Sequence, residues 1–278
     1  MRTAVITLVA GRHRHLLLQQ DGLAAGERQP DHYLAVTMGD PAVPALLRGR
    51  RPVAETLAVP VPSDGRLPLA AARNAGAAKA LAAGADLLVF LDVDCVPGTR
   101  LLARYAETAT DGALLCGTVA YLPPPQPGGY DLAALHTLAP PHPGRPVPAD
   151  DEVLGGGNHD LFWSLSFALT ARTWRTVGGF CEEYSGYGGE DTDFARLAAA
   201  RGVELRWVGG APAHHQHHPV SRPPVEHVDD IVRNASLFHR RWGTWAMEGW
   251  LREFADLGLV ARATTGDGWR VTAREAAG

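Results

Sequence analysis

Lysine is nearly missing from this chain of 278 residues, since Lys79 is the only one and arginine supplies the remaining basic side chains. The 26 basic and 30 acidic residues almost balance, and this balance gives no indication of nucleic-acid binding. Cysteine is also scarce: three residues, without the spacing of a metal site, suit a reducing compartment. No apolar run approaches the ~20 residues that a helix needs to cross a bilayer.

The N-terminal sequence MRTAVITLVAGRHRH is better explained by a first β-strand than by a signal peptide. Its apolar part is short, a single arginine precedes it, and no small-residue cleavage site follows before the basic stretch. We therefore expect a cytoplasmic protein. The length suits one large α/β domain with a buried core, or one such domain with an extension.

Strand and helix signals alternate through the first half of the chain. Strands are predicted at 3–9, 32–37, 56–61, 87–91 and 113–121, and helices at 15–20, 69–83 and 101–108. Such alternation is typical of parallel crossover units with helices on both faces of a sheet. Further signals predict a strand at 161–170, a regular segment at 172–177, a helix immediately after the acidic cluster 190–193, a helix at about 245–255, and a hairpin around 266–268.

Residues 122–157 interrupt this alternation, because they are dense in proline and glycine and show no sustained periodicity. A stretch of this length inside a compact domain is either a functional loop or lid, or a disordered surface insertion. The sequence leaves both alternatives open.

The segment DLLVFLDVDC is the most informative part of the chain. Its five apolar residues, 87–91, predict a strand buried on both faces, and ligands bind just beyond the carboxyl ends of such strands. Asp92 and Asp94 follow, and side chains two apart on a strand point the same way. Two carboxylates that converge beside a core favour a hard divalent cation, which itself holds a diphosphate. The alternative is an Asp turn, helped by the Pro-Gly pair that follows.

Three acids, Glu190, Asp191 and Asp193, follow a turn that is rich in glycine and tyrosine. A helix dipole and N-capping stabilise acids at the start of a helix, and this alternative accounts for one or two of them without any chemistry. It does not account for the glycines and aromatic residues in the same turn. Aromatic faces and clustered carboxylates suit a sugar hydroxyl acceptor, so the cluster is a candidate catalytic site.

A histidine cluster, AHHQHHP, lies at residues 213–219. Histidine is a common metal ligand, but these four histidines cannot all bind one ion that also holds a diphosphate. The others contact phosphate or lie exposed. A zinc site made by the cluster alone is an alternative, although closely spaced histidines in a loop rarely form a closed tetrahedral site.

The order of these motifs resembles that of glycosyltransferases with the GT-A fold, of the family-2-like kind, over roughly residues 3–220. An Ala-Arg-Asn sequence at Arg73 and Asn74 comes first, followed by the Asp-x-Asp pair, a Gly-Gly-Glu-Asp sequence and the histidine cluster. The C-terminal half is similar to the β-1,4-galactosyltransferases and the polypeptide N-acetylgalactosaminyltransferases.

The resemblance implies a Rossmann-like α/β three-layer sandwich with a central mixed, mostly parallel sheet. It also implies a division of the chain. The expected parts are a GT-A domain at 1–220, with a nucleotide-binding half at 1–121, an acceptor and catalytic half at 158–220 and the Pro/Gly-rich loop 122–157 between them, and a helical and hairpin extension at 221–278.

The resemblance assigns the nucleotide-sugar site mainly to the first half of the chain. Arg12 and Asp40 occupy the positions that contact base and ribose. Arg73 and Asn74 precede the metal motif, where the planar donors of an arginine suit ribose hydroxyls or phosphate oxygens. Asp92 would contact ribose or a metal-bound water. The alternatives are a turn residue at Asp40 and solvated charges at the two arginines.

For the reaction itself, the resemblance implies that Asp191 is the general base and that Glu190 holds the acceptor. Inversion at an anomeric carbon requires a base that takes the proton of the attacking hydroxyl. The related retaining enzymes carry Asn after the Glu, whereas this chain carries Asp, which favours inversion.

The resemblance also implies a bound cation, Mn²⁺ or Mg²⁺. Asp94 would bind it directly, and a histidine roughly as far past Glu190 as His215 would complete the site, with His217 as the next choice. Trp163 lies in the apolar run after the triple glycine, where family members contact the donor sugar. The alternative for Trp163 is a place in the core.

The sequence thus predicts a metal-dependent inverting transferase that moves a hexose from a nucleotide-diphosphate sugar, with UDP as the expected nucleotide, to a hydroxyl acceptor on a glycan or natural product. A sugar nucleotidyltransferase is a second hypothesis, but its Gly-rich loop and lysine are missing near the N-terminus. A non-catalytic nucleotide-sugar or carbohydrate-binding protein is a third, against which the intact Glu-Asp pair argues. No feature fixes the oligomeric state, and a homo-oligomer stays open.

Overall fold

The computed structural model describes residues 1–263 and 268–272. Within these residues the strands are β1 (Thr3–Val9), β2 (His32–Met38), β3 (Ala54–Val59), β4 (Leu87–Leu91), β5 (Cys95–Pro97), β6 (Ala113–Tyr121), β7 (Val153–Leu154), β8 (Ser166–Thr170), β9 (Glu204–His215), β10 (Val260–Arg262) and β11 (Trp269–Val271). The α-helices are α1 (His13–Ala24), α2 (Val43–Leu46), α3 (Leu69–Ala82), α4 (Leu101–Thr108), α5 (Leu135–Leu138), α6 (Ala171–Val177), α7 (Glu190–Ala200), α8 (Val228–Trp242) and α9 (Glu248–Asp256). Short 3-10 helices lie at Leu132–Ala134, His159–Leu161 and Val225–His227.

One mixed sheet organises the fold. Among the described residues it contains nine strands, in the order β3-β2-β1-β4-β8-β6-β9-β5, and β7 pairs with β9. The strands β3, β2, β1 and β4 run parallel, as their alternation with helices predicts. In contrast, β8 runs antiparallel to both of its neighbours, β4 and β6. The predicted α/β class with a mixed central sheet is therefore confirmed.

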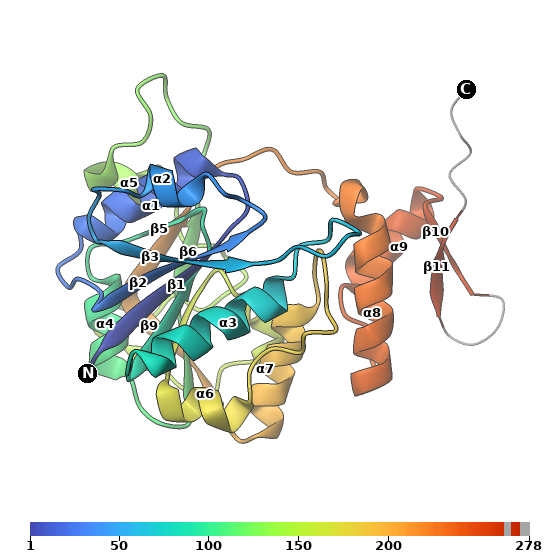
Figure 1. Ribbon diagram of the computed structural model, residues 1–278. Helices are drawn as coiled ribbons and strands as arrows, with labels where there is room; N and C mark the ends of the chain where they lie inside the picture. The colour runs from blue at the N-terminus through green and yellow to red at the C-terminus, as the bar shows by residue number, and fades with distance from the viewer. Residues whose placement is uncertain (264–267, 273–278) are drawn as a thin grey trace.

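Helices cover both faces of the sheet and make three layers (Figure 1). On one face, α3, α6 and α7 contribute Ala77, Trp174 and Phe194 to a single core with the strands. On the other face, α1 and α4 pack through Leu23 and Tyr105. None of the helices within the described ranges is both long enough and apolar enough to cross a membrane.

The C-terminal elements form a separate, smaller core between α8, α9 and the β10–β11 hairpin. They are joined to α7 by Asp193, whose side chain is fully buried. Its carboxylate accepts hydrogen bonds from Arg241 Nε at 2.6 Å, Trp242 Nε1 at 2.7 Å and the Tyr184 hydroxyl at 3.2 Å. The predicted hairpin is present, and residues 264–267 of its turn lie outside the described residues. The division of the chain at residue 220 stays a prediction.

Several predicted boundaries change in the structure. The strand expected within 161–170 begins only at Ser166, and residues 122–157 contain α5 and β7. This Pro/Gly-rich segment packs through Arg145, which is 5% exposed and donates to the carbonyl oxygens of Leu161 and Trp163 at 2.9 and 3.2 Å. A buried arginine that binds two carbonyls makes the segment part of the packed structure, so the alternative of a disordered insertion is wrong.

Candidate active site

The Asp-x-Asp pair lies directly after β4, and a side chain from α1 fixes the backbone of this turn. Gln19 is fully buried on α1, and its side-chain amide donates to the carbonyl oxygens of Asp92 at 2.6 Å and Cys95 at 3.2 Å. The chain then forms β5, which pairs antiparallel with the end of β9 so that Cys95 lies opposite His215. Pairing of these two short segments brings Asp94 beside a histidine that is more than a hundred positions later in the sequence.

Asp94 meets two imidazoles. Its Oδ2 lies 3.5 Å from Nε2 of His215 and 3.5 Å from Nε2 of His218, and the candidate ligand atoms of the three residues all lie within 4.8 Å of one another. Arg12 donates to the same oxygen. Burial raises the pKa of Asp94, but the hydrogen bond from His218 and the charges of His215 and Arg12 outweigh it and lower the pKa below its ordinary value. One carboxylate and two imidazoles are a donor set that fits a divalent transition-metal ion.

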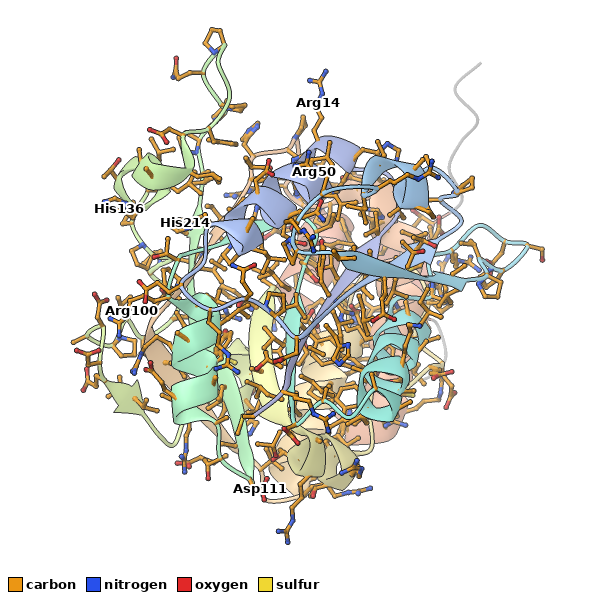
Figure 2. The ribbon with its side chains drawn as sticks, turned by 60° about the vertical axis from the view of Figure 1, so that its left-hand side comes forward. Arg14, Arg50, Arg100, Asp111, His136 and His214 are labelled. Carbon is orange, nitrogen blue, oxygen red and sulfur yellow. The ribbon has the colours of Figure 1, made fainter. Side chains whose placement is uncertain are left out.

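His217 is the next choice after His215 in the sequence, and the choice of metal ligands stays a prediction. The His217 side chain is exposed, and the histidine whose ring nitrogen lies with the candidate ligand atoms of Asp94 and His215 is His218. The reason is that β9 ends at His215, so the alternation of a strand no longer applies beyond it. Gln216 fixes the turn that follows, because its side-chain amide donates a hydrogen bond to the carbonyl oxygen of His15 at 3.0 Å. His214, labelled in Figure 2, is buried with Nδ1 3.4 Å from the carbonyl oxygen of Val96.

His218 and His217 make a matched pair for mutagenesis. Replacing His218 with Ala is expected to weaken Mn²⁺ binding by at least about tenfold, because one of three converging groups is lost. Replacing the exposed His217 with Ala is expected to leave the affinity unchanged. Isothermal titration calorimetry of both variants with MnCl₂, with and without UDP, measures the difference. Equal affinities of the two variants, or a loss in His217→Ala alone, would contradict the assignment.

Arg73 connects the end of β4 with the start of α7. Its guanidinium is 4% exposed and donates to Glu190 at 3.0 Å, to the Ser164 hydroxyl at 2.8 Å and to Asp92 at 3.5 Å. Burial raises the pKa of Glu190, and the neighbouring charge of Asp191 adds to this effect against the pull of Arg73. The arginine therefore holds two carboxylates from distant segments in one place, and direct binding of the donor by Arg73 stays a prediction.

Asn74 has its side-chain amide engaged by a neighbouring loop. Nδ2 donates to the carbonyl of Phe180 at 2.9 Å and to Glu182 at 2.8 Å, and Oδ1 accepts from the backbone N–H of Phe180 at 2.9 Å. These bonds fix the loop between α6 and α7. The expected contact between Asn74 and the nucleotide sugar stays a prediction.

The segment after β1 meets the end of β2, as the parallel sheet requires. Asp40 accepts hydrogen bonds from His13 Nε2 and the Gly11 N–H at 2.7 and 2.8 Å. Burial raises the pKa of Asp40, but these bonds and that from the Ala42 N–H lower it overall. Arg12, between them, adopts a left-handed backbone (φ 52°), whereas Arg14 extends into solvent (Figure 2). The two predicted nucleotide-binding residues Arg12 and Asp40 thus lie on adjoining segments.

A row of aromatic rings connects Trp163 with the Asp94–His215–His218 cluster. The Tyr121 ring is 4.7 Å from His215 and 5.5 Å from His142, and His142 is 4.9 Å from Trp163, all as centroid distances. The Arg145 guanidinium lies 4.1 Å from the Trp163 ring. The Pro/Gly-rich segment therefore forms a wall next to the candidate site. Trp163 is partly buried, and its contact with the donor sugar stays a prediction.

The glycine-rich turn before α7 is held by α8, which sequence reasoning missed. Asn234 is 1% exposed, and its Nδ2 lies 3.1, 3.2 and 2.8 Å from the carbonyl oxygens of Ser185, Tyr187 and Gly188. Asp230 accepts from the Tyr187 N–H at 3.1 Å. The helix could have been found from its apolar residues at helical spacing, Val228, Ile231, Val232, Ala235 and Phe238. The position of the candidate base, Asp191, thus depends on C-terminal residues.

Residues 158–227 match a family profile described as the N-terminal domain of galactosyltransferase. Crystal structures of S. aureus TarS (residues 1–349) and of GalNAc-T7 with UDP, GalNAc and Mn²⁺ superpose with TM-scores of 0.53 and 0.52, at 13% and 14% identity. The matches cover 85% and 91% of this chain and 65% and 56% of those chains. The chain has the GT-A glycosyltransferase fold.

Sequence similarity extends the comparison beyond the fold. The validoxylamine A glucosyltransferase of Streptomyces hygroscopicus subsp. jinggangensis is 29% identical over 206 residues, and that of S. hygroscopicus subsp. limoneus is equally similar. The matches cover 62% of this chain and 44% and 41% of those proteins, so the chain spans less than half the length of these curated relatives. This GT-A chain is therefore similar to galactosyltransferases in its C-terminal half and to a glucosyltransferase over a longer stretch.

Proposed function

We propose that this chain is a metal-dependent, inverting glycosyltransferase that moves a hexose from a UDP-sugar to a hydroxyl acceptor. The observation that carries the proposal is the convergence of three groups near the residues that follow β4. These are the Asp94–His215–His218 cluster, the Arg73–Glu190 pair and Asp191 at the start of α7. The Arg73 guanidinium contacts both Asp92 and Glu190, the residue before Asp191, which supports a shared site for the candidate base and the Asp-x-Asp pair.

The acceptor side of the reaction rests on Asp191. Its side chain is half-buried, and Oδ1 accepts from the Thr192 N–H at 2.7 Å, which orients the carboxylate. In the proposed step, Asp191 takes the proton of the acceptor hydroxyl while that oxygen forms a bond to the anomeric carbon. The bond from the anomeric carbon to the diphosphate oxygen breaks, and its electron pair leaves with UDP. Attack from the face opposite the leaving group inverts the configuration.

The donor side rests on Asp94, His215 and His218, which would hold the cation. A bound cation supplies positive charge to the departing diphosphate. Asp92 accepts from Arg73 at 3.5 Å, and its proposed role is contact with the ribose or with a metal-bound water. Arg12 also contacts Asp94, so the base-binding segment and the metal-binding cluster adjoin.

The similar proteins support parts of this proposal. The structure of GalNAc-T7 contains UDP and Mn²⁺, which supports UDP as the nucleotide and a divalent metal as the cofactor. The two relatives named as glucosyltransferases support glucose as the first donor sugar to test.

A thermal-shift panel tests the proposal directly. UDP-glucose, UDP-galactose and UDP-N-acetylgalactosamine are each added with and without Mn²⁺. At a hundredfold excess over the dissociation constant, the preferred donor is expected to raise the melting temperature by about 5 °C or more, and only when Mn²⁺ is present. No stabilisation by any nucleotide sugar would rule out the proposed donor site.

The products that the protein releases distinguish the proposed transferase from the two alternative functions. Slow UDP release from the preferred donor in the presence of Mn²⁺ favours the transferase. Pyrophosphate release from sugar phosphate and UTP would instead favour a nucleotidyltransferase. Donor binding with neither product would favour the non-catalytic binding protein.

A further inference from the structure

The strand β3 forms one edge of the mixed sheet. It pairs with β2, and in the part of the chain that the structure describes no strand pairs with its outer side. Alternate backbone N–H and C=O groups of β3 therefore point away from the sheet. Proteins commonly block such an edge with lysine, proline or a bulge. The six residues of β3, AETLAV, contain neither lysine nor proline, and their register with β2 is continuous.

The two faces of β3 differ in what covers them. The one charged residue of the strand, Glu55, pairs with Lys79 of α3 at 3.2 Å, so it lies on the face that α3 covers. Because side chains alternate along a strand, Ala54 and Thr56 lie on the opposite face. Both side chains are small, and Thr56 is exposed. The edge of β3 is therefore open on this face.

A cavity of about 370 Å³ lies beside this open face. Ala54 and Thr56 line it, and the loop that follows α2 contributes three arginines, Arg48, Arg50 and Arg51. The residues that line the cavity, all within the described part of the chain, include no acid. The whole chain carries more acidic than basic residues, 30 against 26, so the cavity is a local concentration of positive charge.

The helix α1 fixes the arginine loop and leaves two of its charges unpaired. Gln20 is fully buried, and its side-chain oxygen accepts from Arg50 Nε at 2.9 Å. Arg50 also pairs with Asp21. In contrast, Arg48 and Arg51 are exposed and form no ion pair with any residue that the structure describes. Their planar donors suit carboxylates, which they can bind through two parallel hydrogen bonds.

We propose that the edge of β3 and the arginine-lined cavity form a docking site for an extended acidic segment of a partner protein. Such a segment adds to β3 as a further strand, and its main chain bonds to the outward N–H and C=O groups. Its alternate side chains point to one face, where a carboxylate enters the cavity and meets Arg48 or Arg51. The strand edge supplies affinity for any extended chain, and the arginines select an acidic one.

The other occupants of this surface fit it less well. A small anion would meet the arginines but leave the backbone groups of β3 unpaired. A second copy of this chain, joined through β3, would bring only one acid in the strand, and Glu55 lies on the face of α3. None of the residues assigned to the metal, the donor or the general base lines the cavity, so the inference is independent of the proposed function.

Fluorescence anisotropy with labelled peptides tests the site on the full chain. The first probe is an eight-residue peptide of alternating glutamate and valine. The second has lysine in place of glutamate, and the third has the sequence of the first with its central amides N-methylated, which removes its main-chain donors. The first is expected to bind at least about tenfold more tightly than the other two, because only it supplies both carboxylates and a pairing backbone.

Two variants locate the binding on the protein. The double variant Arg48→Gln/Arg51→Gln is expected to weaken binding of the acidic peptide by about tenfold, since two charge pairs are lost. Thr56→Glu places a carboxylate in the cavity and is expected to weaken binding by a similar factor. All three positions are exposed, so the fold should be kept, and the melting temperature of each variant checks this.

The chain offers a matched control on α6, which packs on the opposite face of the sheet. Arg172→Gln/Arg175→Gln removes two exposed arginines and changes the net charge by the same amount. It is expected to bind the acidic peptide as the wild type does. An equal loss in this control would mean that net charge, and not the cavity, determines binding.

The remaining outcomes each decide one point. Absence of binding by the acidic peptide, or equal affinity for the lysine peptide, overturns the selection of acidic segments. Equal affinity for the N-methylated peptide overturns strand addition and leaves an anion site. A dimer in sedimentation velocity that Thr56→Glu dissociates would make a second copy of the chain the occupant. These measurements need neither UDP nor Mn²⁺, so failure of the proposed donor site would not affect them.

Discussion

Asparagine in place of Asp94 is expected to lower the affinity for UDP in the presence of Mn²⁺ by at least about 100-fold, which is about 2.7 kcal/mol. The Asp94 side chain is 9% exposed, and its carboxylate is the one acidic group in the cluster with His215 and His218. An amide keeps the size of the group and removes the charge that a hard divalent cation requires. Without Mn²⁺, the weak affinity for UDP is expected to be the same in both proteins. Calorimetry with UDP, with and without the metal, measures both quantities.

A suitable control is Asp151→Asn. Asp151 has an 83% exposed side chain and forms a surface ion pair with Arg100 at 3.2 Å, so its charge lies in solvent. This variant should retain full metal-dependent binding. If Asp94→Asn binds UDP with unchanged affinity and unchanged dependence on Mn²⁺, Asp94 is not a metal ligand. The melting temperature of each variant without ligands checks that the fold is intact.

Asparagine in place of Asp191 is expected to slow sugar transfer by about 10²- to 10⁴-fold, the usual contribution of a general base. The substitution keeps an oxygen that can accept from the Thr192 N–H, so the side chain should stay in place. Affinity for UDP and Mn²⁺ should not change, because other residues make up the Asp94–His215–His218 cluster that is proposed to bind the metal. The rate of UDP release from UDP-glucose, measured with wild type and variant at saturating donor, gives the ratio.

The matched control for Asp191 is Asp229→Asn, which removes an exposed acid from the first turn of α8. Its rate should equal that of the wild type. Equal rates of UDP release in Asp191→Asn and wild type would exclude Asp191 as the base. A parallel loss of UDP binding in Asp191→Asn would mean that the residue acts on the donor and not on the acceptor.

Local signals in the sequence were sufficient for the strand that precedes the Asp-x-Asp pair. The run 87–91 is apolar at every position, and all five residues of β4 are buried. Similarly, 101–108 and 113–121 were predicted with the boundaries that α4 and β6 have. These elements carry continuous or amphipathic apolar patterns, so the residues alone determine the type of structure.

The strand β9 could not be predicted in this way, although it carries His215. Its sequence contains Gly209, Gly210 and Pro212, which disfavour strands. Gly210 has φ +72°, and a side chain at Gly209 would overlap the backbone of Ala149. The strand exists because β6, β7 and β5 supply its partners, and these contacts are long-range. The position of His218 beside Asp94 could not be predicted either, because it depends on where β9 ends.

The position of β8 has a consequence for protein engineering. Residues 166–170 lie between β4 and β6, and they hydrogen-bond to both. A chimera joined within the Pro/Gly-rich segment would exchange the central strand of the sheet while keeping both of its neighbours. Recombination with a homologue at that point therefore replaces the contacts of β8 with both β4 and β6. A crossover that takes β4, β6 and β8 from the same parent is the safer design.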